Sequence, residues 1–192
     1  MSKQIILASA SPRRKELLDK FVKNLIVDFV PIDETVPEDM PPEEAVQMLS
    51  LKKARIVAEK YDDGIIIGSD TIVVLDNMML GKPRDNDEAF LMLCQLKGKE
   101  HKVISGLAVI DVKTGRFEVS YETTKVKMGN LSEDMIRRYI ATGETKDKAG
   151  SYAIQGYGAV LVEKIEGDYF NVVGLPLYLL NIMLERFGVC II

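Results

Sequence analysis

Residues 5–21, IILASASPRRKELLDKF, connect an apolar run to a helical pattern through a short polar turn. The residues around 4–8 are typical of a buried strand, and the apolar residues that follow Arg14 recur at helical spacing over about 12–22. Ser11 is a common type of N-cap residue. Pro12 suits the first helical position, where its missing N–H costs nothing. The chain therefore opens with a predicted strand, turn and helix.

Arg13 and Arg14 stand in the first turn of that predicted helix. Arginine is unfavourable there, because the helix dipole already places partial positive charge at this end. Backbone N–H groups, the dipole and two guanidinium groups together suit an anion with several oxygens, such as a phosphate chain. The alternative is a surface turn whose arginines are solvated. The strand and cap on either side favour the phosphate interpretation.

The rest of the chain mixes strands and helices without regular βαβ alternation, which predicts a mixed α/β fold. The 192 residues allow one sizeable core or two lobes that share a sheet. We see no internal repeat or linker. Strands are predicted over 26–32, 65–75, 103–112, 116–127, 152–155 and 159–165, and helices over 41–61, 86–97, 132–143 and 175–187.

Composition narrows the possible partners and the compartment. The formal net charge is −4, and the basic residues are spread along the chain, so nothing supports nucleic-acid binding. No apolar stretch approaches transmembrane length, and we expect no membrane association. Cys94 and Cys190 lie far apart without metal-type spacing and are expected to be buried, reduced thiols. We therefore expect a cytoplasmic protein.

Two carboxylates follow or interrupt predicted strands. Residues 68–71, GSDT, place Asp70 inside the most apolar strand, where a carboxylate is expensive to bury without compensation. Glu34 comes at the end of another predicted strand. The alternatives are a hydrogen-bonded Asp at a strand bend and an ordinary acidic turn. Together, without a matching His/Cys cluster, the two carboxylates suit a hard cation such as Mg²⁺.

Other polar residues could contact a nucleotide. Lys82 in a tight turn and Lys53 on a long helix could supply charges for a triphosphate, although lysines are usually just solvated. Gln155 has an amide that can both donate and accept, as reading a pyrimidine edge requires, but it could equally bond a neighbouring backbone group. His101 is the only histidine, and we expect a structural role for it.

Taken in order, the motifs make the chain resemble the Maf family of nucleotide pyrophosphatases nearly from end to end. The segment around Gln155 is similar to the subgroup that acts on dTTP and UTP. The resemblance rests on Ser9–Arg14 (SASPRR), Ile32–Glu34 (IDE), Lys53-Ala54, Asp70-Thr71, Gly81–Pro83 (GKP), Thr142–Glu144 (TGE), Asp147–Gly150 (DKAG), Tyr152–Gly156 (YAIQG), Gly167 and Asn171–Pro176 (NVVGLP).

The resemblance implies a single domain over residues 1–192, with a two-lobed α/β fold related to inosine-triphosphate pyrophosphatases. It also implies a cleft between the lobes and a homodimer. The expected reaction converts a nucleoside triphosphate to the monophosphate and pyrophosphate. Asp70 is the expected base, and Glu34 and Asp70 would hold Mg²⁺, with Mn²⁺ as the alternative. The residues expected to bind substrate or set specificity are Ser9, Ser11, Arg13, Arg14, Lys53, Thr71, Lys82 and Gln155.

One departure from the family pattern is visible. Met48-Leu49-Ser50 stands where the family often has Arg-Leu-Ala, so no role for that arginine can be carried over. Three other functions are alternatives to this one. A nucleotidyltransferase lacks its glycine-rich loop here, and a serine hydrolase lacks its Gly-x-Ser-x-Gly elbow. A nucleotide-binding regulator of cell division or septum formation, without turnover, would use the same site residues.

Overall fold

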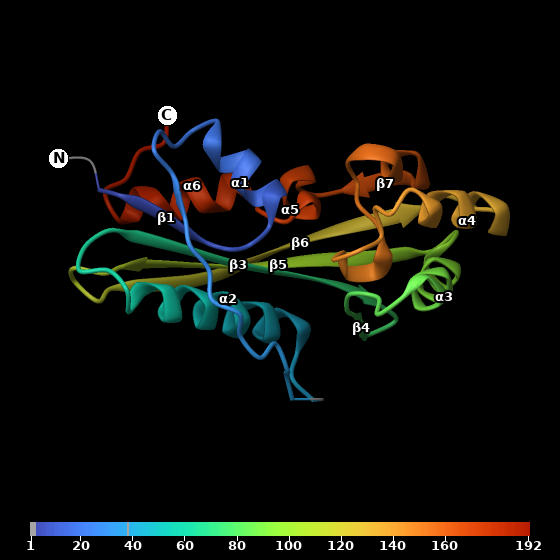
Figure 1. The fold of residues 1–192 in the computed structure, drawn as a ribbon, viewed down its shortest axis with the longest axis horizontal. Helices are drawn as coiled ribbons and strands as arrows, with labels where there is room; N and C mark the ends of the chain where they lie inside the picture. The colour runs from blue at the N-terminus through green and yellow to red at the C-terminus, as the bar shows by residue number, and fades with distance from the viewer. Residues whose placement is uncertain (1–2, 38) are drawn as a thin grey trace. The chain divides into compact units, whose positions relative to one another are not determined.

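The computed structural model describes residues 3–37 and 39–192, and its contacts divide the chain into two units. Unit 1 comprises the described residues up to Asp70 together with Ser105–Glu122 and Gly174–Ile192. Unit 2 comprises Thr71–Ile104 and Thr123–Val173. The chain passes from the first unit to the second between Asp70 and Thr71, within one strand. Figure 1 labels most of the helices and strands.

The strands of the described residues form one mixed sheet. Its order is β2-β1-β3-β5-β6-β7, and β4 pairs with β3. β1 is parallel to β2 and to β3, whereas the β3–β4 and β6–β7 pairs are antiparallel. This confirms the predicted mixed α/β class. The strands are β1 (Ile5–Ala8), β2 (Ile26–Val27), β3 (Ile65–Leu75), β4 (Met78–Leu80), β5 (Glu100–Asp111), β6 (Phe117–Met128) and β7 (Val162–Glu166).

In unit 1, helix α2 (Pro42–Ala58) covers one face of the sheet (Figure 1). Its backbone comes very close to two strand glycines. A Cβ built on Gly68 would lie 2.2 Å from the Ser50 carbonyl oxygen, and one on Gly106 would lie 2.2 Å from that of Val46. Any larger residue would push the helix away. The glycine before Ser69 and Asp70 is therefore required for α2 to pack on this strand.

Helices α1 (Pro12–Asp19) and α6 (Leu177–Arg186) lie on the opposite side of the unit 1 strands from α2 (Figure 1). Leu17 and Leu18 of α1 and Leu180 and Leu184 of α6 are at most 4% exposed. Burying such a side chain is worth about 1.5–3 kcal/mol. The apolar positions that predicted these helices are thus the positions that hold α1 and α6 in the core.

Unit 2 contains α3 (Asn86–Leu96), α4 (Glu133–Ala141), α5 (Tyr169–Val173) and the short 3₁₀ helices η1 (Ala149–Ser151) and η2 (Gly156–Leu161). The predicted helix starts are confirmed. The Asp85 carboxylate accepts from the Glu88 N–H at 2.8 Å, and the Ser132 hydroxyl accepts from the Met135 N–H at 3.2 Å. These side chains satisfy N–H groups that the first turn leaves without a helical partner.

Three predicted elements differ from the structure. The strand expected over 26–32 is only Ile26–Val27, because the chain leaves β1 before reaching Pro31, which has no N–H to donate. The strand expected over 152–155 is absent. Of the strand expected over 159–165, the first three residues belong to η2 (Gly156–Leu161), and β7 begins at Val162. The expectation of two buried cysteines is also wrong, since Cys94 is half-buried and Cys190 is exposed.

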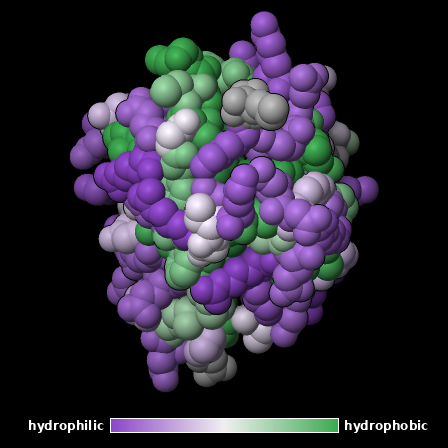
Figure 2. All heavy atoms as spheres, turned by 90° about the vertical axis from the view of Figure 1, so that its left-hand side faces the viewer, coloured by the Kyte–Doolittle hydropathy of each residue, from purple (hydrophilic) through white to green (hydrophobic). Residues whose placement is uncertain are grey.

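The surface is mostly polar on the face shown in Figure 2. Hydrophilic side chains cover most of that face, and apolar groups lie between them. Within residues 3–37 and 39–192, no helix has both the length and the apolar character needed to span a membrane.

Candidate active site

The turn between β1 and α1 is held by the guanidinium of Arg14. Its Nε donates to the Gly174 carbonyl oxygen at 2.7 Å, and its Nη1 donates to the Ser69 carbonyl oxygen at 2.8 Å and to the Ser9 hydroxyl at 3.1 Å. The Ser9 hydroxyl also accepts from the Ser11 N–H at 3.2 Å. Arg14 thus connects the turn to the residue that directly precedes Asp70 on β3.

Arg14 and Arg13 have different surroundings, although they are neighbours in the sequence. Arg14 is 9% exposed, and burial lowers its pKa to about 10, so the guanidinium remains charged at neutral pH. Asp70 and Glu34 oppose this shift through their charges. Arg13 is half-buried. Ser11 occupies the predicted N-cap position but makes no side-chain capping bond.

Lys53 lies between the two carboxylates that the sequence singled out. Its ammonium is 2.6 Å from Glu34 Oε1 and 2.5 Å from Asp70 Oδ1. The Lys53 and Asp70 side chains are 16% and 10% exposed, while that of Glu34 is 41% exposed. A buried carboxylate needs such a partner, because removing one member of a buried ion pair costs about 3–5 kcal/mol. The predicted residues Glu34, Lys53 and Asp70 therefore form one cluster in unit 1.

Local hydrogen bonds explain why Glu34, rather than its neighbour, contacts Lys53. The Asp33 carboxylate accepts from the Thr35 N–H at 2.9 Å and from the Thr35 hydroxyl at 2.6 Å. The same bonds lower the pKa of Asp33. The Lys52 ammonium donates to the Asp33 carbonyl oxygen at 2.6 Å, which connects this loop to α2. Asp33 is thus engaged within its own turn.

The donor set of this cluster fits Mg²⁺. No group of three or more His, Cys, Asp or Glu side chains that could hold a metal occurs among the described residues. Mg²⁺ does not require one, since it is usually bound by one or two carboxylates together with substrate phosphates and water. Glu34 and Asp70 offer two carboxylates and no sulfur or imidazole ligand. They are the residues that would hold this ion.

Unit 2 carries the other predicted site residues. Thr71 follows Asp70 on β3 and is half-buried, and Lys82 lies exposed in the connection between β4 and α3. Gln155 is half-buried and lies in an irregular segment just before η2 instead of in a strand.

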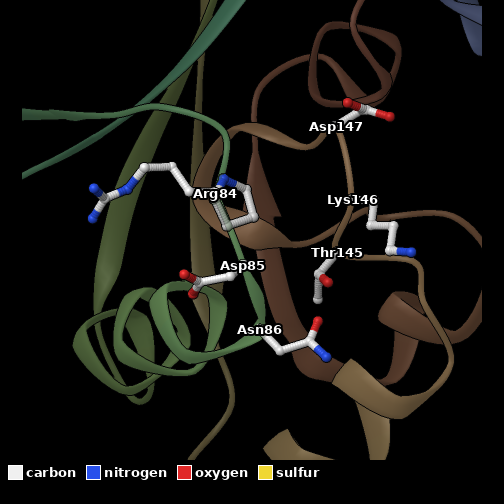
Figure 3. A pocket seen from close by; sticks show the side chains of 7 residues that line it. Arg84, Asp85, Asn86, Thr145, Lys146 and Asp147 are labelled. Atoms are coloured by element: carbon white, nitrogen blue, oxygen red, sulfur yellow. The ribbon is translucent and has the colours of Figure 1, made fainter.

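A hollow of about 230 Å³ lies between two loops of unit 2, one of which directly follows Lys82 in the sequence (Figure 3). The Arg84 side chain points away from the second loop, and its Nε is 3.0 Å from the Glu88 carboxylate. Asp85 caps α3. These charged groups already have local partners, and we assign the hollow no role. Its lining residues are Pro83, Arg84, Asp85, Asn86, Thr145, Lys146 and Asp147.

Sequence reasoning missed the groups that hold the predicted site residues in place. The carbonyl oxygens of Ser69 and Gly174 carry no side-chain signal, yet both accept from Arg14. The sequence shows Glu144 only as part of the 142–144 motif, but its carboxylate accepts from two backbone N–H groups shortly after Gln155. The sequence signal for this contact is a pair of glycines, Gly143 directly before Glu144 and Gly156 directly after Gln155. Both adopt a positive φ in the structure.

The fold places the chain in a known class of mixed α/β proteins. A solved structure of the Staphylococcus aureus Ham1 protein matches with a TM-score of 0.53 and 10% sequence identity, over 83% of this chain and 80% of that chain. At this identity the likeness concerns the fold alone. It agrees with the fold that the family resemblance implies.

The chain belongs to the family described as Maf-like protein, whose model matches residues 4–187. Relatives at high coverage carry the name dTTP/UTP pyrophosphatase. The one from Dictyoglomus thermophilum is 49% identical, with 98% of both chains covered. Those from Pelotomaculum thermopropionicum and Methanococcoides burtonii are 46% and 47% identical, with 97% and 98% of this chain covered, and 97% of each relative.

Proposed function

We propose that this protein is a nucleoside triphosphate pyrophosphatase that hydrolyses dTTP and UTP, and modified pyrimidine nucleotides as well, to the monophosphate and pyrophosphate. Relatives 46–49% identical over nearly the whole chain bear the name of that activity. The structural observation that supports it best is the Lys53 ammonium between the carboxylates of Glu34 and Asp70. In such a cluster the ammonium can bind phosphate oxygens, and the carboxylates can hold a metal ion or accept a proton from water.

Asp70 is the proposed general base. It accepts a proton from water while the water oxygen attacks the α-phosphorus, and the bond from that phosphorus to the bridging oxygen of the leaving pyrophosphate breaks. Asp70 is 7% exposed, which limits competition from bulk solvent. Its position at the residue after Ser69 is fixed by Arg14, which bonds the Ser69 carbonyl oxygen at 2.8 Å. Bases of this kind typically contribute 10²–10⁴-fold to the rate.

The cationic residues divide into two roles. Arg13, Lys53 and Lys82 are proposed to contact phosphate oxygens, with Ser9 and Ser11 supporting the turn at which the phosphates bind. Arg14 is proposed to hold that turn, because its Nε and Nη1 already donate to three oxygens of the protein. It adds a fixed positive charge beside Asp70 and Glu34.

Glu34 and Asp70 would hold Mg²⁺, or Mn²⁺ in its place. Bound there, the ion would neutralise charge that develops on the phosphates during transfer. Lys53 has three N–H donors, so it can keep one carboxylate while it donates to a phosphate oxygen. The chain itself thus supplies both the ligands for the ion and a second cation.

Gln155 is proposed to read the base, with Thr71 as a secondary contributor. Thymine and uracil present an acceptor, the N3 donor and an acceptor along one edge. A glutamine amide can donate to a carbonyl and accept from N3–H at once. Cytosine has an acceptor at N3, which leaves one group unpaired at a cost of about 1–3 kcal/mol.

A panel of nucleoside triphosphates with Mg²⁺ tests the reaction. We expect pyrophosphate and a monophosphate from dTTP and UTP, and loss of activity on chelation of the metal. Release of inorganic phosphate with a diphosphate product would contradict attack at the α-phosphorus. Absence of any turnover would leave the non-catalytic regulator of cell division as the function, although no relative named above carries such a description.

The protein is further proposed to act as a homodimer in the cytoplasm, as the family resemblance implies. Light scattering coupled to size exclusion measures the first property directly. A molecular mass equal to the monomer's 21.5 kDa at assay concentration would contradict it.

A further inference from the structure

The segment that carries Gln155 is anchored by side chains from elsewhere in unit 2. The Tyr139 hydroxyl on α4 accepts from the Ala153 N–H at 3.1 Å. The Glu144 carboxylate accepts from the Tyr157 N–H at 2.9 Å and from the Gly158 N–H at 3.0 Å. These contacts lie two residues before Gln155 and two to three residues after it. The segment therefore has fixed ends even though it belongs to no strand.

Glu144 is in tight contact with the backbone next to Gln155. A Cβ built on Gly156 would lie 2.2 Å from Glu144 Oε1, and Gly156 has a φ of +64°. The positive φ favours glycine at this position, and the short distance shows how closely the Glu144 carboxylate packs against it. One carboxylate holds two successive N–H groups, and hydrogen bonds to a charged acceptor are worth about twice those between neutral groups. The turn after Gln155 is thus built around the Glu144 carboxylate.

Tyr139 fixes the other end in a similar way. Its hydroxyl would lie 2.9 Å from a Cβ on Gly158, and the Ala153 carbonyl oxygen would lie 2.1 Å from the same Cβ. Ala153 and Gly158 are therefore packed together beside the Tyr139 hydroxyl, and the residues between them form a closed loop. Tyr139 is only 4% exposed, so its hydroxyl has little access to water as an alternative partner.

We propose that Glu144 and Tyr139 are positioning residues for base recognition, which act by holding the loop 153–158 and hence the backbone of Gln155. This inference rests on the proposed function, in which Gln155 reads the pyrimidine edge. Two amide hydrogen bonds to one base require the amide to stay in place, because a displacement of about 1 Å is enough to lose productive geometry. Base selectivity therefore depends on Glu144 even though Glu144 does not contact the base.

Glu144→Gln is the main test. The new amide oxygen can accept from one of the two N–H groups, whereas the amide nitrogen can only face the other as a second donor. We expect the ratio of kcat/KM for dTTP to that for CTP to fall at least about fivefold, which corresponds to about 1 kcal/mol. We expect the larger part of the loss to be a raised KM for dTTP, because Asp70 is unchanged.

Tyr139→Phe is the second variant. It removes the acceptor for the Ala153 N–H and keeps the ring, and we expect the same direction of change. Glu163→Gln on β7 is the matched control, since Glu163 is exposed and the charge change is identical. The control should keep the wild-type ratio. Thermal unfolding of all three variants separates a loss of selectivity from a loss of folded protein.

The outcomes separate the inference from the proposed function. A wild-type protein that releases no pyrophosphate, or shows no preference for dTTP over CTP, overturns the proposed function and the inference with it. A selective wild type together with a wild-type ratio in Glu144→Gln overturns the inference alone. A reduced ratio in Glu144→Gln, at temperatures where the variant is fully folded, supports it.

Discussion

Replacing Arg14 by lysine should destabilise the protein strongly while retaining the charge. The guanidinium donates to the Gly174 and Ser69 carbonyl oxygens and to the Ser9 hydroxyl, at 2.7, 2.8 and 3.1 Å. A lysine ammonium is a single point of charge and cannot keep the fork geometry of these contacts. If two of the three bonds are lost, at about 1.5–3 kcal/mol for each bond to a charged donor, the cost is about 3–6 kcal/mol.

Urea unfolding followed by far-UV circular dichroism measures this loss. The midpoint should fall without a change in the slope, which would show that stability changed and the denatured state did not. For a chain of this size, 1 kcal/mol lowers Tm by about 2–4 °C, so the Tm should fall by at least about 6 °C. Arg13→Lys is the matched control, because Arg13 is half-buried in the same turn.

The two substitutions should therefore affect different properties: Arg14→Lys mainly lowers stability, and Arg13→Lys mainly weakens substrate binding. Arg13→Lys should raise the KM for dTTP and cost less than about 1 kcal/mol of stability, as expected for a partly exposed charged contact. An Arg14→Lys protein with the wild-type urea midpoint and a raised KM would refute the reasoning. It would mean that the Arg14 guanidinium leaves its backbone acceptors and binds phosphate.

Asp70→Asn should lower kcat for dTTP by about 10²–10⁴-fold in folded protein, and wild-type turnover would leave Asp70 without the role of base. Gln155→Ala should remove most of the preference for dTTP over CTP, expected at roughly ten- to a hundredfold, and an unchanged kcat/KM ratio would place base recognition elsewhere. Burial lowers the pKa of His101 from 6.5 to about 4. At pH values between these two pKa values, His101 therefore binds a proton in the unfolded chain but not in the folded one. Stability should consequently fall by about 2 kcal/mol from pH 7 to pH 5, and His101→Gln should flatten this part of the profile in urea titrations; equal slopes for both proteins would contradict the argument.

Elements with strong local signals were predictable from the sequence. The strand expected over 65–75 is β3, because a long apolar run between polar turns leaves few alternatives. The helix expected over 86–97 is α3, and Asp85 followed three residues later by Glu88 is a local pattern that specifies the hydrogen bond found at its start. Both signals arise within a few residues of the element they predict.

The segment 152–155 was mispredicted because its structure depends on distant residues. Its apolar residues and flanking glycines look like a strand, and Tyr152, Ala153 and Ile154 are indeed buried. The Ala153 N–H, however, bonds a tyrosine on α4 instead of a strand neighbour, and the Tyr152 hydroxyl lies 2.7 Å from His101 Nε2. Nothing in the local pattern reveals these partners.

The candidate site was predictable in its residues but not in its pairing. The strand context singled out Asp70, and the polar turn singled out Arg13 and Arg14. The sequence could not show that Lys53 contacts both carboxylates, since α2 and β3 meet only in the folded chain. It also could not distinguish the two arginines, because their burial depends on carbonyl groups far away in the sequence.

The lengths of the strands have a consequence for how copies of this protein behave in solution. The long strands β3, β5 and β6, of 11, 12 and 12 residues, all have neighbours on the sheet path. The strands at the borders of the sheet, β2, β4 and β7, have only two, three and five residues. Short edge strands offer few unpaired backbone N–H and C=O groups to another chain. On β7, Glu163, Lys164 and Glu166 are also exposed, which adds charge at that border. The borders formed by β2 and β7 are thus protected from intermolecular strand pairing, and the early end of β2 contributes to that protection.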